Sequence, residues 1–154
     1  MMEEKDTNVK ILFRFFSNIL DQQAVETLWA TVIDAEKGLY QLDNIPFYAS
    51  VSCGDIVFAE FDETENSLTY RETIEHSGNS TIQVILNDKS FDINNLRELF
   101  NSLGCESEKF NSDYFVMEIP ADLDYAPIRE KLIELEESNI ITYAEPNLSK
   151  NHWY

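Results

Sequence analysis

The side chains that most often catalyse reactions are few in this chain and do not fall into a recognised catalytic motif. The 2 histidines are His76 and His152, and only His76 has close hydroxyl neighbours, Ser77 and Ser80 among them. A hydroxyl beside a base is what nucleophilic catalysis needs, but no nucleophile-elbow pattern surrounds this pair. Serine, glycine and asparagine also form ordinary turns, so we expect a structural turn at residues 76–80 and no catalytic residues.

Metal and cofactor sites have no support in the spacing of ligand residues. The 2 cysteines, Cys53 and Cys105, belong to no Cys-x-x-Cys pair or Cys/His cluster. The acidic run at residues 62–65 lacks the glycine and the distal glutamate of a calcium loop, which favours a solvated hairpin turn. Because no glycine-rich phosphate loop or dinucleotide fingerprint occurs either, we expect neither a metal nor a cofactor.

The charge of the chain limits the partners that it can have. Its 154 residues include 29 acidic and 11 basic side chains, a formal net charge of −18 at pH 7. Nucleic-acid binding needs a basic surface and anionic membranes repel an acidic one, so we expect neither kind of partner. The hydrophobic fraction of 44% is too high for a disordered acidic tail and indicates a folded protein suited to a basic partner.

The N-terminal residues and the apolar segments indicate a cytoplasmic protein. Residues 1–8 are mostly charged or polar and lack the basic and apolar regions of a secretory signal. The longest apolar cluster, Val9–Leu20, is interrupted by Lys10 and Arg14, so we do not expect it to span a membrane. In a reducing compartment both cysteines are expected to remain thiols.

The elements that would position these residues differ between the two halves of the chain, which predicts an α+β protein. Five short strand-like segments with polar turns indicate a small β-barrel-like sheet over residues 8–77: Val9–Phe15, Glu26–Ile33, Leu39–Leu42, Ile56–Phe61 and Leu68–Ile74. Residues 78–146 alternate in the order β-α-β-β-α-β, which is the ferredoxin-like pattern. The predicted elements there are strands at Thr81–Leu86, Cys105–Phe110, Tyr114–Ile119 and Ile140–Ala144, and helices at Ile93–Leu103 and Asp124–Asn139. We expect residues 147–154 to form a C-terminal tail.

Aromatic residues crowd the first half and raise the question of a binding surface. Adjacent residues of a strand face opposite sides, so Phe15 and Phe16 do not share a face, nor do Phe47 and Tyr48. The rings either fill a two-sided core or leave one member of each pair exposed as a binding hot spot beside the acids. Our candidate partner-binding residues combine an acidic hairpin with its expected neighbours: Asp43, Tyr48, Asp55, Glu60, Asp62, Glu63 and Glu65.

Several segments resemble a bacterial family of small proteins of unknown function. The most specific is Leu39–Ala49, which reads Leu-Tyr-Gln-Leu-Asp-Asn-Ile-Pro-Phe-Tyr-Ala; weaker pieces are Gly54–Val57, Ser77–Ile82 and Ile119–Ile128. The resemblance extends from about Val9 to Glu145. We expect related sequences to carry a histidine in the Ser-Gly-x-Ser-Thr turn, where this chain has Asn79. The resemblance implies a bacterial source and supplies no activity.

Three classes of function remain open on the sequence alone. The size, the acidity and the lack of catalytic motifs favour an immunity protein that binds and blocks a basic bacterial toxin domain, such as a nuclease. The alternative is a non-catalytic regulatory or ligand-binding module, in which the acidity serves only solubility. A third hypothesis is an enzyme with an unrecognised site around His76, which would require a pocket that holds this histidine beside an acid and a hydroxyl.

Overall fold

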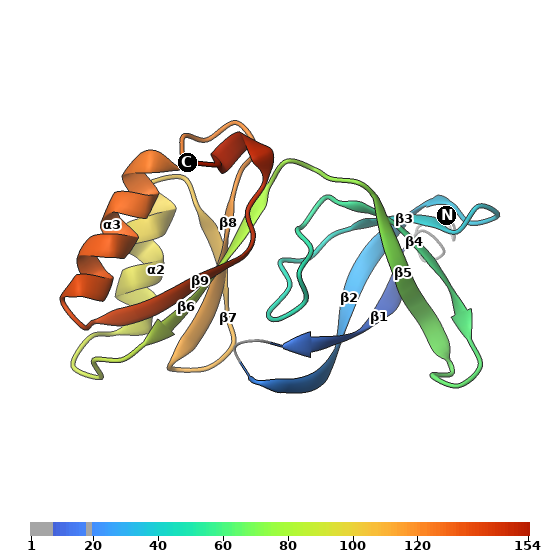
Figure 1. Cartoon of the computed structure of the whole chain (residues 1–154), viewed down its shortest axis with the longest axis horizontal. Coiled ribbons are helices and arrows are strands. Elements are labelled where there is room, and N and C mark those ends of the chain that lie inside the picture. Colours follow the sequence, from blue (N-terminus) through green and yellow to red (C-terminus); the bar gives the residue numbers. More distant parts are fainter. Residues whose placement is uncertain (1–7, 18–19) are drawn as a thin grey trace. The chain divides into compact units, whose positions relative to one another are not determined.

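The computed structural model describes residues 8–17 and 20–154 of the chain (Figure 1). By its internal contacts the chain divides into two compact units, one that ends at Ser77 and one that begins at Gly78. Each unit contains its own cluster of buried hydrophobic side chains. Each sheet is therefore stabilised by residues of its own half of the sequence.

The first unit is a closed barrel in which the strands follow one another in sequence order. They are β1 (Asn8–Ser17), β2 (Gln22–Asp34), β3 (Leu39–Leu42), β4 (Ile56–Asp62) and β5 (Ser67–Glu75). Consecutive strands pair antiparallel, and β5 closes the barrel against β1 through a parallel pairing of Leu12 with Thr69. Closure pairs the two outermost strands with each other, which removes the free edges that favour aggregation.

Alternation along β1 and β2 builds the core of the barrel. Ile11 lies opposite Leu28 and both are buried, while Phe13 stacks on Tyr70 with ring centroids 4.6 Å apart. Burying a side chain such as Phe13 stabilises the fold by about 1.5–3 kcal/mol. The same alternation separates the adjacent rings, because Phe15 packs against the core and Phe16 is 52% exposed.

The turn between β2 and β3 depends on a glycine, as the sequence suggests. Gly38 has a φ of 73°, in the left-handed region that glycine adopts without strain. Its carbonyl oxygen accepts a hydrogen bond from the Ala59 N–H at 3.0 Å. A Cβ at this position would lie 2.8 Å from the Ala59 carbonyl oxygen. Both the backbone conformation and the close approach of β4 therefore require glycine here.

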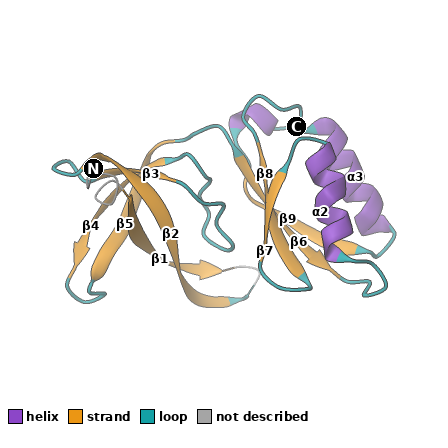
Figure 2. Ribbon diagram, turned by 180° about the vertical axis from the view of Figure 1, so that it is seen from behind, coloured by secondary structure: helices purple, strands orange, loops and turns teal. Residues whose placement is uncertain are grey.

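The second unit is a four-stranded antiparallel sheet with two helices on one face (Figure 2). The strands are β6 (Ser80–Leu86), β7 (Glu106–Lys109), β8 (Tyr114–Ile119) and β9 (Ile141–Asn147), in the spatial order β7-β8-β6-β9. The helices are α2 (Ile93–Ser102) and α3 (Ala126–Glu137). Their apolar faces pack on alternate residues of the central strands, with Phe100, Phe115 and Leu132 fully buried.

The helix ends follow local signals in the sequence. The Asp92 carboxylate accepts the Asn94 N–H at 2.8 Å and caps α2, and Gly104 follows its end with a φ of 104°. Asn139 ends α3 with a φ of 62°. Asp124, expected to cap the second helix, accepts the Ala126 N–H at 3.1 Å, and the regular helix begins at Ala126.

The predicted α+β class is confirmed, with a barrel first and a helix-covered sheet second. The predicted C-terminal tail at 147–154 is not separate: β9 runs to Asn147, and a 3-10 turn, η1 (Lys150–His152), packs on the second unit. Within this turn His152 is buried, at 3% exposure. Within residues 8–17 and 20–154, no helix is long and apolar enough to cross a membrane.

Candidate functional site

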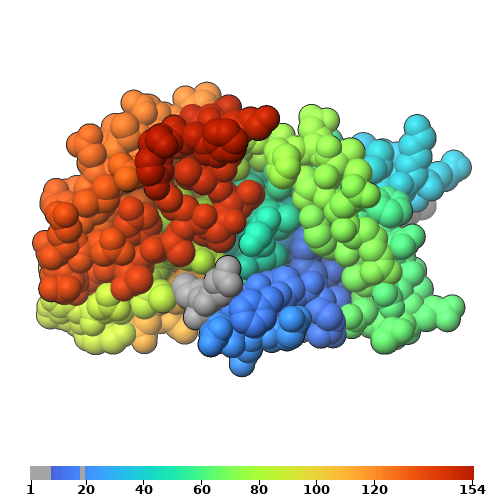
Figure 3. Space-filling model, viewed as in Figure 1, coloured from blue at the N-terminus to red at the C-terminus, as the bar shows by residue number. Residues whose placement is uncertain are grey.

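The hairpin between β4 and β5 brings the predicted acidic residues together. The Asp62 carboxylate accepts the Thr64 N–H at 2.8 Å and the Glu65 N–H at 3.1 Å. This side chain therefore stabilises the turn by binding the backbone of the two residues. Asn66 completes the reversal with a φ of 55°, a conformation that asparagine tolerates. The hairpin lies at the surface of the barrel, shown in green in Figure 3. The expected hairpin turn is therefore present, and its own residues stabilise its conformation.

Two arginines hold the carboxylates of this hairpin in place. Arg14 on β1 donates two hydrogen bonds to the Glu65 carboxylate, at 2.6 and 3.0 Å. Arg71 on β5 donates to the Glu60 carboxylate at 3.1 Å and to the Asp62 carboxylate at 2.9 Å. These contacts position the carboxylates of Glu60, Asp62 and Glu65. The hairpin has a fourth carboxylate, that of the exposed Glu63, which forms no ion pair with the described residues.

The same contacts shift the titration of the hairpin acids. The hydrogen bond from Arg71, followed by those from the turn backbone, lowers the pKa of Asp62. The hydrogen bond from Arg14 lowers the pKa of Glu65. Asp62 and Glu65 therefore stay ionised to lower pH than free carboxylates do.

An exposed aromatic ring lies in the same strand as two of these acids. Phe61 is 60% exposed although it lies in β4, between Glu60 and Asp62. Because adjacent residues of a strand face opposite sides, Phe61 points away from these two carboxylates and lies on the side of β4 that carries the buried Val57 and Ala59. Its cross-strand partner is Leu68. An exposed phenylalanine is costly to hydrate, and Phe61 was not among the candidate residues predicted from the sequence.

Three predicted residues do not lie with the hairpin. Asp43, Tyr48 and Asp55 belong to the loop between β3 and β4, at the opposite end of β4 from the hairpin (Figure 1). The strand has 7 residues, so its ends are about 20 Å apart at the usual rise of a strand. The expectation that these residues surround the acidic hairpin is therefore wrong, because β4 separates the two groups.

Asp55 is not available to a partner at all. It is 1% exposed, and its carboxylate accepts the Ser52 N–H at 3.0 Å and the Ser77 N–H at 2.9 Å. These bonds satisfy one backbone donor within the loop and one just after β5, so Asp55 is a structural residue. Asp43 is exposed and Tyr48 is half-buried. Burial, and secondarily the Glu26 carboxylate, raises the pKa of Tyr48.

The loop that follows β3 is anchored by a carboxylate that the sequence analysis passed over. Glu26 lies at an inward position of β2 and accepts three successive backbone N–H groups, from Phe47 at 2.6 Å, Tyr48 at 3.1 Å and Ala49 at 3.0 Å. An acid in the inward register of an otherwise apolar strand was the available signal. Glu26 therefore shapes the Pro46–Ala49 segment and does not face a partner.

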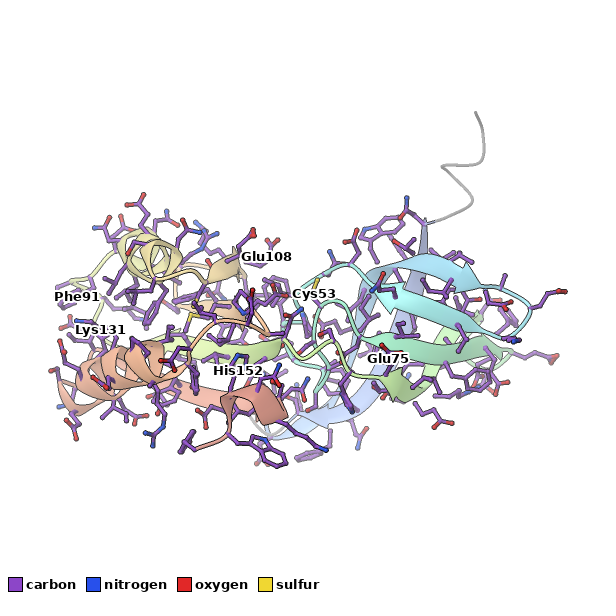
Figure 4. All side chains as sticks on the ribbon, turned by 90° about the horizontal axis from the view of Figure 1, so that it is seen from above. Cys53, Glu75, Phe91, Glu108, Lys131 and His152 are labelled. Carbon is purple, nitrogen blue, oxygen red and sulfur yellow. The ribbon has the colours of Figure 1, made fainter. Side chains whose placement is uncertain are left out.

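The serine and histidine residues are engaged in structural contacts. The Ser77 hydroxyl donates to the Cys53 carbonyl at 2.9 Å. Ser80 lies 2.6 Å from His152 Nδ1, and the His152 Nε2–H donates to the Pro120 carbonyl at 2.9 Å. Figure 4 shows His152 beside the sheet. Because Ser80 has 0% exposure, this Ser–His pair offers no hydroxyl to a substrate, and it secures η1 instead. His76 is exposed, with Nδ1 4.0 Å from Asp55.

Small hollows lie on the second unit. One of about 170 Å³ is enclosed by the start of α3 and the C-terminal residues, and Tyr125, Arg129 and Tyr154 contribute to its lining. Another of about 390 Å³ lies beside α2 and is lined by polar residues such as Asn94 and Glu98. Ligand sites are commonly apolar and about 300–1,000 Å³ in volume, so neither hollow fits the usual description in both size and lining.

The described part of the chain offers no cluster of metal-ligating side chains. Among residues 8–17 and 20–154, no three His, Cys, Asp or Glu side chains are grouped as metal ligands would be. Neither Cys53 nor Cys105 forms a disulfide within the described part of the chain. Burial, together with the nearby Glu118 carboxylate, raises the pKa of Cys105 to about 12. Cys105 is therefore a hydrophobic core residue rather than a reactive group.

The fold has a counterpart of known structure but of unknown activity. A hypothetical protein from Neisseria gonorrhoeae superposes with a TM-score of 0.79 and 23% sequence identity, over 92% of this chain and 96% of that one. At this identity the likeness shows the fold alone. No curated protein sequence matches the chain. Residues 26–143 match the family described as a domain of unknown function, DUF4265. This match covers most of the chain, which therefore belongs to the DUF4265 family.

Proposed function

We propose that this protein is an immunity protein, which binds a basic bacterial toxin domain through the β4–β5 hairpin and blocks it. The observation that supports this function is the β4–β5 hairpin, in which the 60% exposed Phe61 and the exposed Glu63 lie two residues apart. The ring supplies the apolar contact of a hot spot, and the carboxylates of the hairpin supply attraction for a cationic surface. Toxins that cut nucleic acids have such a surface, because they bind phosphates.

The arrangement of the hairpin suits rapid and specific binding. Arg14 and Arg71 hold Glu65, Glu60 and Asp62 in fixed positions, so a partner does not have to order these side chains on binding. The remaining acids give the chain its net charge of −18. Long-range attraction of this kind accelerates encounter with a basic protein by about 10–1,000-fold at low salt.

The alternative is a non-catalytic regulatory or ligand-binding module. The feature that supports it is the hollow of about 170 Å³ beside α3, which is smaller than most ligand sites but brings the rings of Tyr125 and Tyr154 close to Arg129. A ligand in this hollow at 100 times its Kd would raise the stability of the second unit by about 2.7 kcal/mol. A thermal-shift screen against metabolites therefore separates this alternative from the immunity function.

We also infer a ferredoxin-like second unit and a cytoplasmic location. The order β6-α2-β7-β8-α3-β9 agrees with the ferredoxin-like pattern, to which this chain adds η1. The two free thiols are those expected of a reducing compartment. An immunity protein acts where its toxin would otherwise damage the cell that makes it, and for a nuclease toxin this is the cytoplasm.

The decisive experiment first looks for a toxin-like domain encoded next to this gene, which is the partner that the proposal expects. Cells that express that domain should survive when the chain is co-expressed, and purified chain should bind it at a rate that falls with ionic strength. Phe61→Ser should speed dissociation by about 10-fold or more, as expected for a hot spot.

A charge-matched pair of variants tests the position of the site. Glu63→Lys, in the hairpin, and Glu137→Lys, on α3, change the net charge equally, and both residues are exposed. Only Glu63→Lys should weaken binding strongly if the hairpin is the contact. Equal effects of the two variants would mean that charge acts only at long range, and survival that does not depend on the chain would refute the function itself.

A further inference from the structure

One arginine of the second unit has no oxygen acceptor for its guanidinium. Arg14, Arg71 and Arg97 each donate hydrogen bonds to carboxylate or hydroxyl oxygens. Arg129 on α3 forms no ion pair with the described residues, and its Nε–H is buried without a hydrogen-bond partner. A buried donor that stays unpaired lowers the stability of a fold. In a chain with 29 acidic residues, an arginine without an acceptor therefore needs an explanation.

Two phenol groups occupy the carboxylate that lies closest to hand for Arg129. The Glu145 carboxylate accepts the Tyr125 hydroxyl at 2.5 Å and the Tyr154 hydroxyl at 2.7 Å. The Tyr154 ring also lies over Arg129, with the guanidinium carbon 3.6 Å from the ring centroid. Stacking of this kind covers a face of the guanidinium, whereas its N–H groups lie in its plane. The contact with Tyr154 therefore leaves these donors in need of an oxygen atom.

The side chain of Arg129 lines a hollow of about 170 Å³. The hollow lies between the start of α3 and the C-terminal residues, which are side by side in Figure 1. The rings of Tyr125, Trp153 and Tyr154 supply further parts of its lining. An apolar cavity of about 150 Å³ is large enough to hold one benzene molecule. This hollow therefore has room for a ligand with a single ring.

We propose that this hollow binds a small carboxylate that carries one ring. A guanidinium binds a carboxylate through charge-assisted hydrogen bonds, which are shorter and stronger than neutral ones. Arg129 would thus hold the carboxylate of the ligand, while Tyr125, Trp153 and Tyr154 contact its ring. The site gives a ligand class to the ligand-binding alternative, on which it rests, and it does not depend on the immunity function.

The charges around the hollow favour a ligand with a single negative charge. Asp124 and Glu130 lie in the lining together with Arg129, and the Asp124 carboxylate already accepts the Ala126 N–H. The net charge of the chain is −18, so it repels a doubly charged phosphate more strongly than a singly charged carboxylate. We expect a Kd of about 1 mM for a carboxylate of this size.

Benzoate is the probe for this site, and benzamide is its neutral control of nearly the same shape. Titration of the isotope-labelled full chain with benzoate up to about 20 mM should shift the NMR signals of residues 124–130 and 151–154 until they saturate. Benzamide should bind at least about 10-fold more weakly, because it brings no charge to the guanidinium. Inorganic phosphate should also bind more weakly than benzoate.

Two variants of α3 that change the charge equally test the role of Arg129. Arg129→Gln should abolish the saturable binding of benzoate. Lys131→Gln removes a cation that pairs with Glu134 at the surface, so it should change the affinity by less than about 2-fold. Tyr154→Phe keeps the ring but frees an oxygen of Glu145 to pair with Arg129, so it should weaken benzoate binding.

Each outcome of these titrations supports or overturns the proposal. Signals that do not saturate with benzoate refute the site, and so do equal affinities for benzoate and benzamide or equal losses in Arg129→Gln and Lys131→Gln. Tighter binding of phosphate than of benzoate would refute the carboxylate as the ligand. If Arg129→Gln fails to fold by circular dichroism, the comparison of benzoate with benzamide in the parent chain decides. Phe61→Ser should bind benzoate like the parent chain, so the result is separate from that for toxin binding.

Discussion

Glu26 offers a sharp test of how a single carboxylate shapes the barrel. Its two oxygens accept three backbone N–H groups, from Phe47, Tyr48 and Ala49, at 2.6 to 3.1 Å. A hydrogen bond to a charged acceptor contributes about 1.5–3 kcal/mol net when buried. Glu26 is half-buried, so water replaces part of each bond, and we expect loss of the carboxylate to cost about 2–3 kcal/mol in total.

The most informative substitution is Glu26→Gln. Glutamine has almost the same shape, but it replaces one acceptor oxygen with an amide group that donates. That amide would face an N–H donor of the loop, so Glu26→Gln should cost nearly as much as Glu26→Ala. If the side chain acted through packing alone, Glu26→Gln would instead be close to neutral.

Urea unfolding measures this loss in the barrel alone. The chain has 2 tryptophans, Trp29 on β2 and Trp153 in the second unit, so a Trp153→Phe background leaves Trp29 as the reporter. The unfolding midpoint of Glu26→Gln should fall by about 1–2 M at the usual urea dependence of small domains. A Glu26→Gln midpoint equal to that of the parent, with Glu26→Ala destabilised, would refute the hydrogen-bond explanation.

Three further predictions concern acid stability, thiol reactivity and the C-terminal segment. Arg14 holds the pKa of Glu65 below its ordinary value of 4.5. Their pairing therefore stabilises the barrel fully above pH 4.5, and this stabilisation is lost as pH falls through the lowered pKa. In Arg14→Met, stability followed by circular dichroism should decrease less steeply as the pH is lowered. Cys53 is half-buried, while burial raises the pKa of Cys105 to about 12; a thiol reagent at neutral pH should therefore modify one cysteine quickly and the other only on unfolding, and mass spectrometry of the peptides identifies which. His152→Ala removes a 3% exposed side chain with bonds to Ser80 and Pro120, so it should destabilise the second unit by about 2–4 kcal/mol and make the last residues susceptible to protease.

The elements of the fold were predictable because their signals are local. Strand-like segments and apolar spacing located the elements, and the structure has a capping Asp92 and a left-handed Gly104 at the ends of α2, as local rules for helix ends require. The acidic turn at residues 62–65 was predicted from its run of charged residues, and its conformation is also local, since Asp62 binds the backbone two and three residues further on. These features depend on neighbours in the sequence.

The site was only partly predictable because its contacts are not local. Arg14 reaches Glu65 across 51 positions of the sequence, so the pairing of the acids with arginines could not be read from the acidic run. In the sequence Asp55 follows Gly54 in a loop, where an acid is expected to be exposed. A hydrogen bond from the distant Ser77 N–H joins this loop to the end of β5, and Asp55 is buried there. The order of residues 148–154 likewise depends on a contact between His152 and Ser80, 72 positions apart.

The parallel pairing of Leu12 with Thr69 has a consequence for how the barrel opens. β1 and β2 are joined along ten paired positions, whereas β1 and β5 share a single one. The barrel can therefore open by separation of β1 from β5 while the hydrogen bonds between its other strands stay intact. Amide protons next to the β1–β5 pairing should exchange with deuterium well before those of the β1–β2 ladder. Local opening of the barrel therefore begins between its first and last strands.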